Sequence, residues 1–147
     1  MAVSFHQRHP EFSLKKKSVH KKWIHTCVGH FKKRPGSIAF IFTTNEELLR
    51  MNQEYLNHNY FTDVITFDYC EGDLVSGDVF ISVDQVALNA SEYKVSPGDE
   101  MRRVMIHGVL HLLGYDDATE QERSQMRELE NDALLLWLKV VGNESGI

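Results

Sequence analysis

The stretch HGVLHLLGYDD, from His107 to Asp117, organises the rest of this 147-residue sequence. Its first eight residues end the segment MRRVMIHGVLHLLG, residues 101–114, whose apolar residues recur on nearly every side of a helical projection. A helix that is apolar all round is buried, in contrast to a surface helix with one polar face. The sequence therefore predicts a buried central helix, and the two histidines within it need partners.

These two histidines have a spacing that suits metal binding. His107 and His111 are four residues apart, so on a helix they project from the same face about 6 Å apart in rise. Gly114 follows, where a left-handed glycine ends a helix, and the chain can then return Asp117 as a third ligand. Two imidazole nitrogens and one carboxylate suit Zn²⁺ with an open fourth position, which is typical of catalytic sites.

The same residues allow other interpretations. Both histidines can be core residues bonded to the backbone and followed by an acidic helix cap, and Asp116 competes with Asp117 as third ligand. We prefer Asp117 because its spacing matches the third ligand of the metzincin pattern H-E-x-x-H-x-x-G-x-x-H. Zinc peptidases of that pattern carry Glu after the first His as general base, and this chain has Gly108 there. The pattern therefore argues against a metzincin-like metallopeptidase.

Three segments together resemble one known family. They are HGVLHLLGYDD, TDVITF at residues 62–67 and GDVFIS at residues 77–82. In these segments the chain is similar to the YbeY family of bacterial rRNA maturation factors, which are metal-dependent endoribonucleases. The usual metal pattern of that family is H-G-x-L-H-L-x-G-Y-D-H, and the likeness extends with gaps from Asn45 to Glu130.

The resemblance implies a site and an activity. It implies that His107, His111 and Asp117 bind one zinc ion and act in catalysis. It further implies cleavage of single-stranded RNA, maturation of the 16S rRNA 3′ end and a part in ribosome quality control, with ribosomal RNA and the ribosome as partners. Whether a ribosomal protein or a GTPase guides the enzyme stays open. The alternative is a non-catalytic, ribosome-associated RNA-binding module whose zinc only stabilises the fold.

Two residues depart from the family pattern. Asp117 replaces the usual third histidine, and because a carboxylate is a normal zinc ligand, we expect binding with altered affinity. Leu56 follows Tyr55 where the family segment L-N-x-x-Y-R has Arg, so a phosphate-facing cation is missing. His58, Arg50 or the basic N-terminal region are the candidates to replace it, and the sequence does not decide among them.

Length and composition favour one cytoplasmic domain that covers residues 1–147. A chain with 42% hydrophobic residues is long enough for a single core. Cys27 and Cys70 are too few for a disulfide framework, which favours a reducing compartment. The first residues contain no apolar signal segment, and the longest apolar run, ALLLWL at residues 133–138, is too short to span a membrane.

Charge is distributed unevenly along the chain. The net charge is −5, yet residues 1–35 hold nine Lys and Arg against one Glu, a local balance of +8. Such asymmetry allows a basic face that binds phosphates, with the solvated face of a helix as the alternative interpretation.

The periodicity of the remaining sequence predicts an α+β fold, with about four strands in a mixed sheet covered by helices and the metal helix at the centre. Expected strands cover residues 2–5, 37–44, 63–69 and 79–83, with a turn at 32–37 and a hairpin connection at 70–78. Expected helices cover residues 14–31, 45–56 and 84–93, the metal helix opened by Ser96 and Pro97, and a last helix capped by Thr119 and Glu122.

Several side chains receive specific expectations. Trp23 is expected in the core, and four residues of the 45–56 helix are expected to face it: Leu48, Leu49, Tyr55 and Leu56. Asp63 and Asp78, at or near strand starts, are either acceptors that orient a ligating imidazole or carboxylates that bind loop amides, and we favour the second interpretation.

Overall fold

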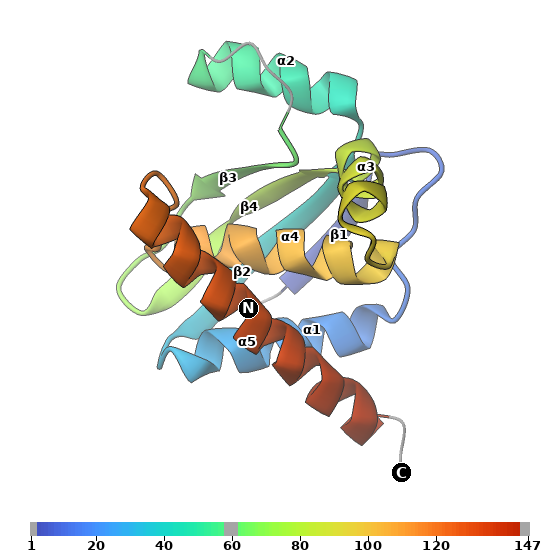
Figure 1. The fold of residues 1–147 in the computed structure, drawn as a ribbon. Helices are drawn as coiled ribbons and strands as arrows, with labels where there is room; N and C mark the ends of the chain where they lie inside the picture. Colours follow the sequence, from blue (N-terminus) through green and yellow to red (C-terminus); the bar gives the residue numbers. More distant parts are fainter. Residues whose placement is uncertain (1–2, 58–61, 145–147) are drawn as a thin grey trace.

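A computed structural model of the chain describes residues 3–57 and 62–144, and it has the α+β architecture that the sequence predicts (Figure 1). The elements, in chain order, are β1 (Val3–Gln7), α1 (Lys17–His30), β2 (Arg34–Thr43), α2 (Asn45–Leu56), β3 (Val64–Asp68), β4 (Leu74–Ser82), α3 (Val83–Tyr93), α4 (Pro97–Leu112) and α5 (Glu120–Glu144). No helix in the described part of the chain is both long and apolar enough to cross a membrane.

The four strands form one mixed sheet in the order β1-β2-β4-β3. The pairs β1–β2 and β2–β4 are parallel, and β3 runs antiparallel to β4. The last pair confirms the expected hairpin connection, although β4 begins at Leu74, earlier than the sequence suggests. In this register Thr66 of β3 lies opposite Val79 of β4, and both side chains point toward α4.

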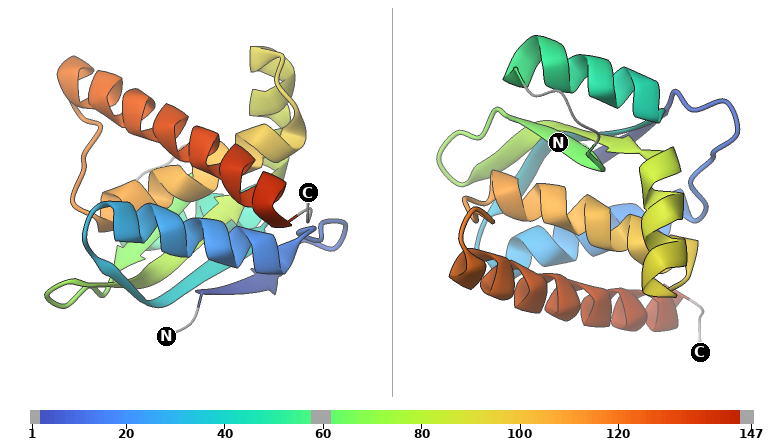
Figure 2. Two further views of the ribbon diagram at one scale, coloured as in Figure 1. Left: turned by 90° about the horizontal axis from the view of Figure 1, so that it is seen from below. Right: turned by 45° about the horizontal axis from the view of Figure 1, so that its top comes forward.

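Helices cover both faces of the sheet in layers. One face carries α1, packed on β1 and β2, and α4, packed on β3 and β4, while α5 lies across these two helices as an outer layer (Figure 2). The opposite face carries α2, whose Leu48 and Met51 pack against Ile65 of β3. The predicted central helix, α4, is therefore enclosed between the sheet and α5.

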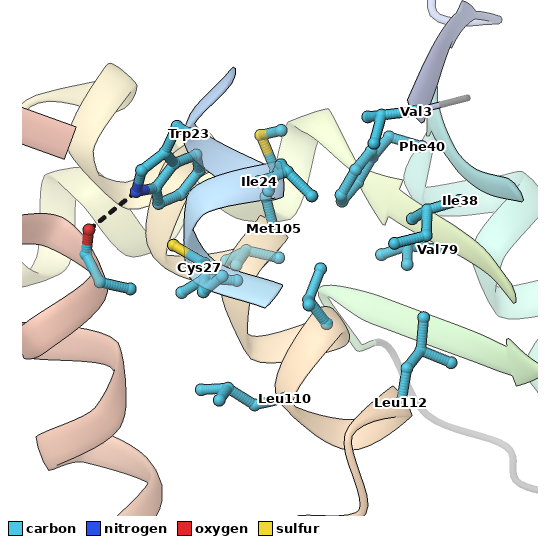
Figure 3. Packing of buried hydrophobic residues seen from close by; sticks show 14 of the residues in the cluster. Val3, Trp23, Ile24, Cys27, Ile38, Phe40, Val79, Met105, Leu110 and Leu112 are labelled. Atoms are coloured by element: carbon cyan, nitrogen blue, oxygen red, sulfur yellow. Dashed lines mark hydrogen bonds between the residues drawn. The ribbon is translucent and has the colours of Figure 1, made fainter. Parts of the chain in front are cut away.

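The main core lies between the sheet and the α1–α4 layer (Figure 3). Trp23, Phe40 and Met105 are fully buried there, so the core role predicted for Trp23 is confirmed. The indole Nε1–H of Trp23 donates to the carbonyl of Ala133 at 2.8 Å, which fixes α1 against α5. A buried indole needs such a partner, because an unpaired polar group in a core costs free energy.

The predicted helix caps are present. Thr44 Oγ1 accepts from the amide of Glu47 at the start of α2, and Ser96 Oγ accepts from the amide of Asp99 at the start of α4. Before α5, Thr119 and Glu122 form a reciprocal capping box, with bonds of 2.9 and 3.1 Å. These local signals set where the site-bearing helices begin.

Two expectations about side-chain burial in α2 are wrong. Tyr55 is 64% exposed and Leu56 is 43% exposed, whereas Met51 and Asn52 are buried with Leu48. Within residues 3–57 and 62–144, the last turn of α2 has little to pack against, and the ring of Tyr55 meets that of Phe67 edge-on at 5.9 Å. Leu56 instead faces the cleft beside the two histidines.

The expected turn at residues 32–37 is also partly wrong, because β2 already begins at Arg34. The amide of Arg34 donates to the carbonyl of Asp73, and the pairing with β4 shifts register between Pro35 and Ile38. Gly36 serves close packing here, since a Cβ on it would lie 2.2 Å from Ser76 Oγ. At the N-terminus, β1 extends to Gln7, and Ala2 of the predicted strand lies outside the described residues.

Candidate metal centre

The C-terminal half of α4 presents the two predicted histidines side by side. Their ring centroids are 4.7 Å apart and nearly perpendicular, and the side chains of His107 and His111 are 23% and 25% exposed. Helical spacing of four residues produces this juxtaposition. The rings face one another and an acidic neighbour, so the interpretation as backbone-bonded core histidines does not hold.

Gly114 returns the chain toward these rings, as the sequence predicts. Its φ of 100° is left-handed, its amide donates to the carbonyl of His111, and the amide of Tyr115 donates to that of Leu110, both at 3.0 Å. This pair of bonds is the Schellman arrangement, which favours glycine because other residues are strained at positive φ. The reversal places Asp117 over the end of the helix, whereas Asp116 is exposed and lies outside the group.

Three side-chain atoms of this group converge on one point. His107 Nε2 lies 3.1 Å from Asp117 Oδ2, His111 Nε2 lies 3.4 Å from the same oxygen, and the two Nε2 atoms are 3.1 Å apart. Atoms that each lie 2.0–2.1 Å from a tetrahedral zinc ion are separated by about 3.3 Å. The donor set of two imidazoles and one carboxylate therefore fits a metal ion in both chemistry and spacing.

Glu130 of α5 is a partner of this group that sequence reasoning missed. Its Oε2 lies 2.6 Å from His107 Nδ1, and its Oε1 accepts from Arg103 at 2.9 Å. Because a hydrogen bond at Nδ1 fixes the proton there, Nε2 is left with its lone pair toward the group. Burial lowers the pKa of His107, but the hydrogen bond and charge of Glu130, together with Asp117, outweigh it and raise the pKa overall.

The two aspartates considered for this orienting role have other partners. Asp63 Oδ2 accepts from the side-chain amide of Asn89 at 3.1 Å, and burial raises the pKa of its carboxyl, an effect that nearby His107 partly offsets. Asp78 accepts a long hydrogen bond from the Tyr69 hydroxyl at 3.4 Å. Asp63 nevertheless lies beside the site, since it lines the same clefts as His107.

Gly108 has a steric reason to be glycine. A Cβ on it would lie 2.7 Å from Val79 Cγ1 and 3.2 Å from Thr66 Cγ2, so any side chain at this position would force α4 or the sheet to shift. The general-base Glu of zinc peptidases would occupy this point between helix and sheet. The structure thus adds a packing argument against the peptidase interpretation.

Two clefts open onto the group. One, of about 380 Å³, runs toward α2 and β3 and includes Leu56, so the residue that replaces the family Arg does face the site. The other, of about 570 Å³, runs toward α3 and α5. Donors that line open clefts differ from those of structural zinc sites, which are closed by four protein ligands.

The proposed substitutes for the missing Arg lie elsewhere or outside the described residues. Arg50 is on the exposed side of α2, where it pairs with Glu47 at 3.5 Å. His58 lies outside the described part of the chain. In the basic N-terminal region, Lys15 and Lys16 line a different cleft, beside Pro97 at the opposite end of α4.

Comparison with known proteins gives one family. A family model described as Endoribonuclease YbeY matches residues 2–137. A Bacteroides thetaiotaomicron protein named Endoribonuclease YbeY is 44% identical over 136 residues, 92% of this chain and 99% of the relative. One of that name from Phocaeicola vulgatus is 47% identical over 84% of this chain and 88% of its own. A solution structure of a Thermotoga maritima protein has the same fold, with a TM-score of 0.66 and 24% identity over 99% of this chain and 96% of that one.

Proposed function

The chain belongs to the YbeY endoribonuclease family, and on this premise we propose that it is a zinc-dependent endoribonuclease for single-stranded RNA. Membership supports hydrolysis of RNA phosphodiester bonds, as the names of the relatives state. The finer part of the proposal is action in the cytoplasm on ribosomal RNA, in 16S rRNA 3′-end maturation and ribosome quality control, with His107, His111 and Asp117 as metal ligands.

One observation carries the proposal: three donor atoms meet within 3.1–3.4 Å of one another where two open clefts join. An ion bound there supplies a Lewis acid for a phosphoryl oxygen at an open coordination position. Nitrogen and carboxylate donors in a set of three favour zinc.

The protein side chains hold this arrangement ready. Glu130 keeps the proton of His107 on Nδ1, and Arg103 neutralises the buried carboxylate of Glu130. Arg123 donates to the carbonyls of Asp117 and Ala118 at 3.4 and 2.9 Å, which ties the returning loop to α5. Ligand positions fixed in this way before binding reduce the ordering that substrate or ion must impose.

The test combines metal analysis of the purified protein with RNA cleavage before and after chelation. We expect His111→Ala to lose zinc and cleavage together, because two donors no longer define a site. The matched control is His25→Ala, since His25 is an exposed residue of α1 and its replacement leaves the group intact.

Full nuclease activity in a zinc-free His111→Ala protein would refute this function. The non-catalytic module makes the opposite prediction. A folded ligand variant would then keep its full RNA binding and would still support rRNA processing in cells.

A further inference from the structure

The two clefts beside the metal group form one passage across the site. Asp63, Val64, His107 and Asp117 line both of them, so a chain that enters beside α2 can leave between α3 and α5. A flexible single strand can follow such a passage.

Among the described residues, positive charge is found on only one side of this passage. Among the described residues, the cleft toward α2 and β3 is lined by no Lys or Arg, and Leu56 lies where the family pattern has its cation. The cleft toward α3 and α5 contains three guanidinium groups, those of Arg103, Arg123 and Arg127. The described cations that can replace the missing one therefore lie across the site from Leu56.

The three arginines differ in how far they are already engaged. Arg103 is held by Glu130 and by Asn131 Oδ1, at 2.9 and 2.8 Å. Arg123 uses one terminal nitrogen on the loop that carries Asp117. Arg127, one turn further along the same face of α5, is exposed and forms no hydrogen bond or ion pair within residues 3–57 and 62–144.

The same cleft also presents an aromatic surface. Tyr93, the last residue of α3, lines it and is 59% exposed. Bases of a single strand stack on exposed aromatic rings regardless of sequence. Of the acidic side chains of this cleft, Glu100 and Glu130 are buried, Asp63 is half-buried and Asp117 belongs to the metal group. Arg123, Arg127 and Tyr93 are exposed, so a bound strand meets them at the rim.

We propose that the cleft between α3 and α5 is the subsite for the RNA segment next to the cleaved bond, with Arg127 and Arg123 on a backbone phosphate and Tyr93 stacked on an unpaired base. This inference rests on the proposed function, and it specifies which side of the site holds the strand. It assigns to α5 the phosphate contact that Leu56 cannot make.

A rival footprint is the basic end of α1. Lys15 and Lys16 lie beside Pro97, and ten helical residues separate Pro97 from His107, about 15 Å of rise. RNA held there would depend on the lysines and not on Arg127. The two footprints therefore predict different responses to charge removal.

The experiment measures binding of a labelled single-stranded RNA oligonucleotide to the full chain, as a function of salt and with chelator present to prevent cleavage. We expect Arg127→Gln to weaken binding several-fold and to lower the log–log salt slope by about 0.7, the value for one lost phosphate contact on a single strand. Tyr93→Leu should weaken binding by roughly 5- to 150-fold with the slope unchanged.

Lys139→Gln is the matched control, because it removes one exposed positive charge from the same helix about 18 Å further along. An unchanged slope in Arg127→Gln, or no measurable binding by the wild type, overturns the subsite. The proposed subsite is also wrong if the salt slope falls only when four lysines of α1 and its N-cap are replaced by Gln, namely Lys16, Lys17, Lys21 and Lys22. That result would assign the RNA strand to α1. Cleavage by the wild type with zinc restored is scored separately, so loss of the proposed function is distinguishable from loss of the subsite.

Discussion

Replacement of Glu130 by Gln tests whether the carboxylate behind His107 tunes the metal site. Gln retains the shape and one acceptor oxygen, so the 2.6 Å hydrogen bond to His107 Nδ1 can persist without its negative charge. A hydrogen bond to a charged group contributes about 1.5–3 kcal/mol and a neutral one about 0.5–1.5 kcal/mol. The exchange therefore removes about 1–1.5 kcal/mol, which is roughly a tenfold loss of zinc affinity.

A roughly tenfold loss lies at the lower end of the range of about 10- to 100-fold by which metal affinity falls when the partner of a ligating histidine is replaced. The lower end is expected because Gln weakens the acceptor and does not remove it. The assay is competition for zinc between the protein and a chromogenic chelator at pH 7. The matched control is Glu128→Gln, the same change on the exposed side of α5. If Glu130→Gln holds zinc as tightly as this control, the proposed role of Glu130 is wrong.

The variant needs a separate measurement of folding, because Glu130 also pairs with Arg103 at 2.9 Å. In the metal-free variant, the half-buried guanidinium of Arg103 faces a neutral amide in place of a carboxylate, so its charge is less well compensated. Urea unfolding of the metal-free variant measures this cost independently. A variant that is folded at the concentration of the zinc assay makes the affinity change attributable to the site.

Two further predictions concern the scaffold. Gly108→Ala should lower the free energy of unfolding, measured in urea, by about 1 kcal/mol, because overpacking against Val79 costs about 1–3 kcal/mol and the better helix propensity of Ala returns about 1 kcal/mol. The control Gly142→Ala places its new Cβ near no other atom and should not be destabilising. Equal effects of the two substitutions would contradict the close contact at Gly108. His20 is buried, and burial is the main reason that its pKa falls to about 4 from 6.5. Since the unfolded chain binds the proton first as pH falls, this group should remove about 2 kcal/mol of stability between pH 7 and 5. Urea unfolding of His20→Gln should lack that part of the decline, and an identical pH profile would exclude the assignment.

Much of the site is predictable because it is local. Eleven residues contain His107, His111, Gly114 and Asp117, and helical geometry together with one left-handed residue brings the three donors together. No packing information is needed for that step. The same holds for the caps of α2, α4 and α5, in which a side chain accepts from a backbone amide three residues away.

The misassigned parts depend on contacts between distant segments. The apolar character of Tyr55 predicts burial, but only the position of α2 on the sheet determines that its last turn has few neighbours in the described part of the chain. Gly36 suggests a turn from its residue type alone, whereas the adjacent Ser76 of β4 explains its presence within a strand. Sequence patterns predict which face of a helix or strand is buried, but they do not predict how far the neighbouring element extends along it.

Glu130 is the instructive case, because a signal for it exists in the sequence. The buried stripe of α5 contains Met126, Ala133 and Trp137, and helical periodicity places residue 130 on that same stripe. A carboxylate in a buried stripe requires a charged or hydrogen-bonding partner. In α4 the polar residues Arg103 and His107 form a stripe of their own at a spacing of four. Two helices that each carry polar groups along a buried face stabilise one another when those faces pack together. The hydrogen bonds that join Glu130 of α5 to Arg103 and His107 of α4 show this packing.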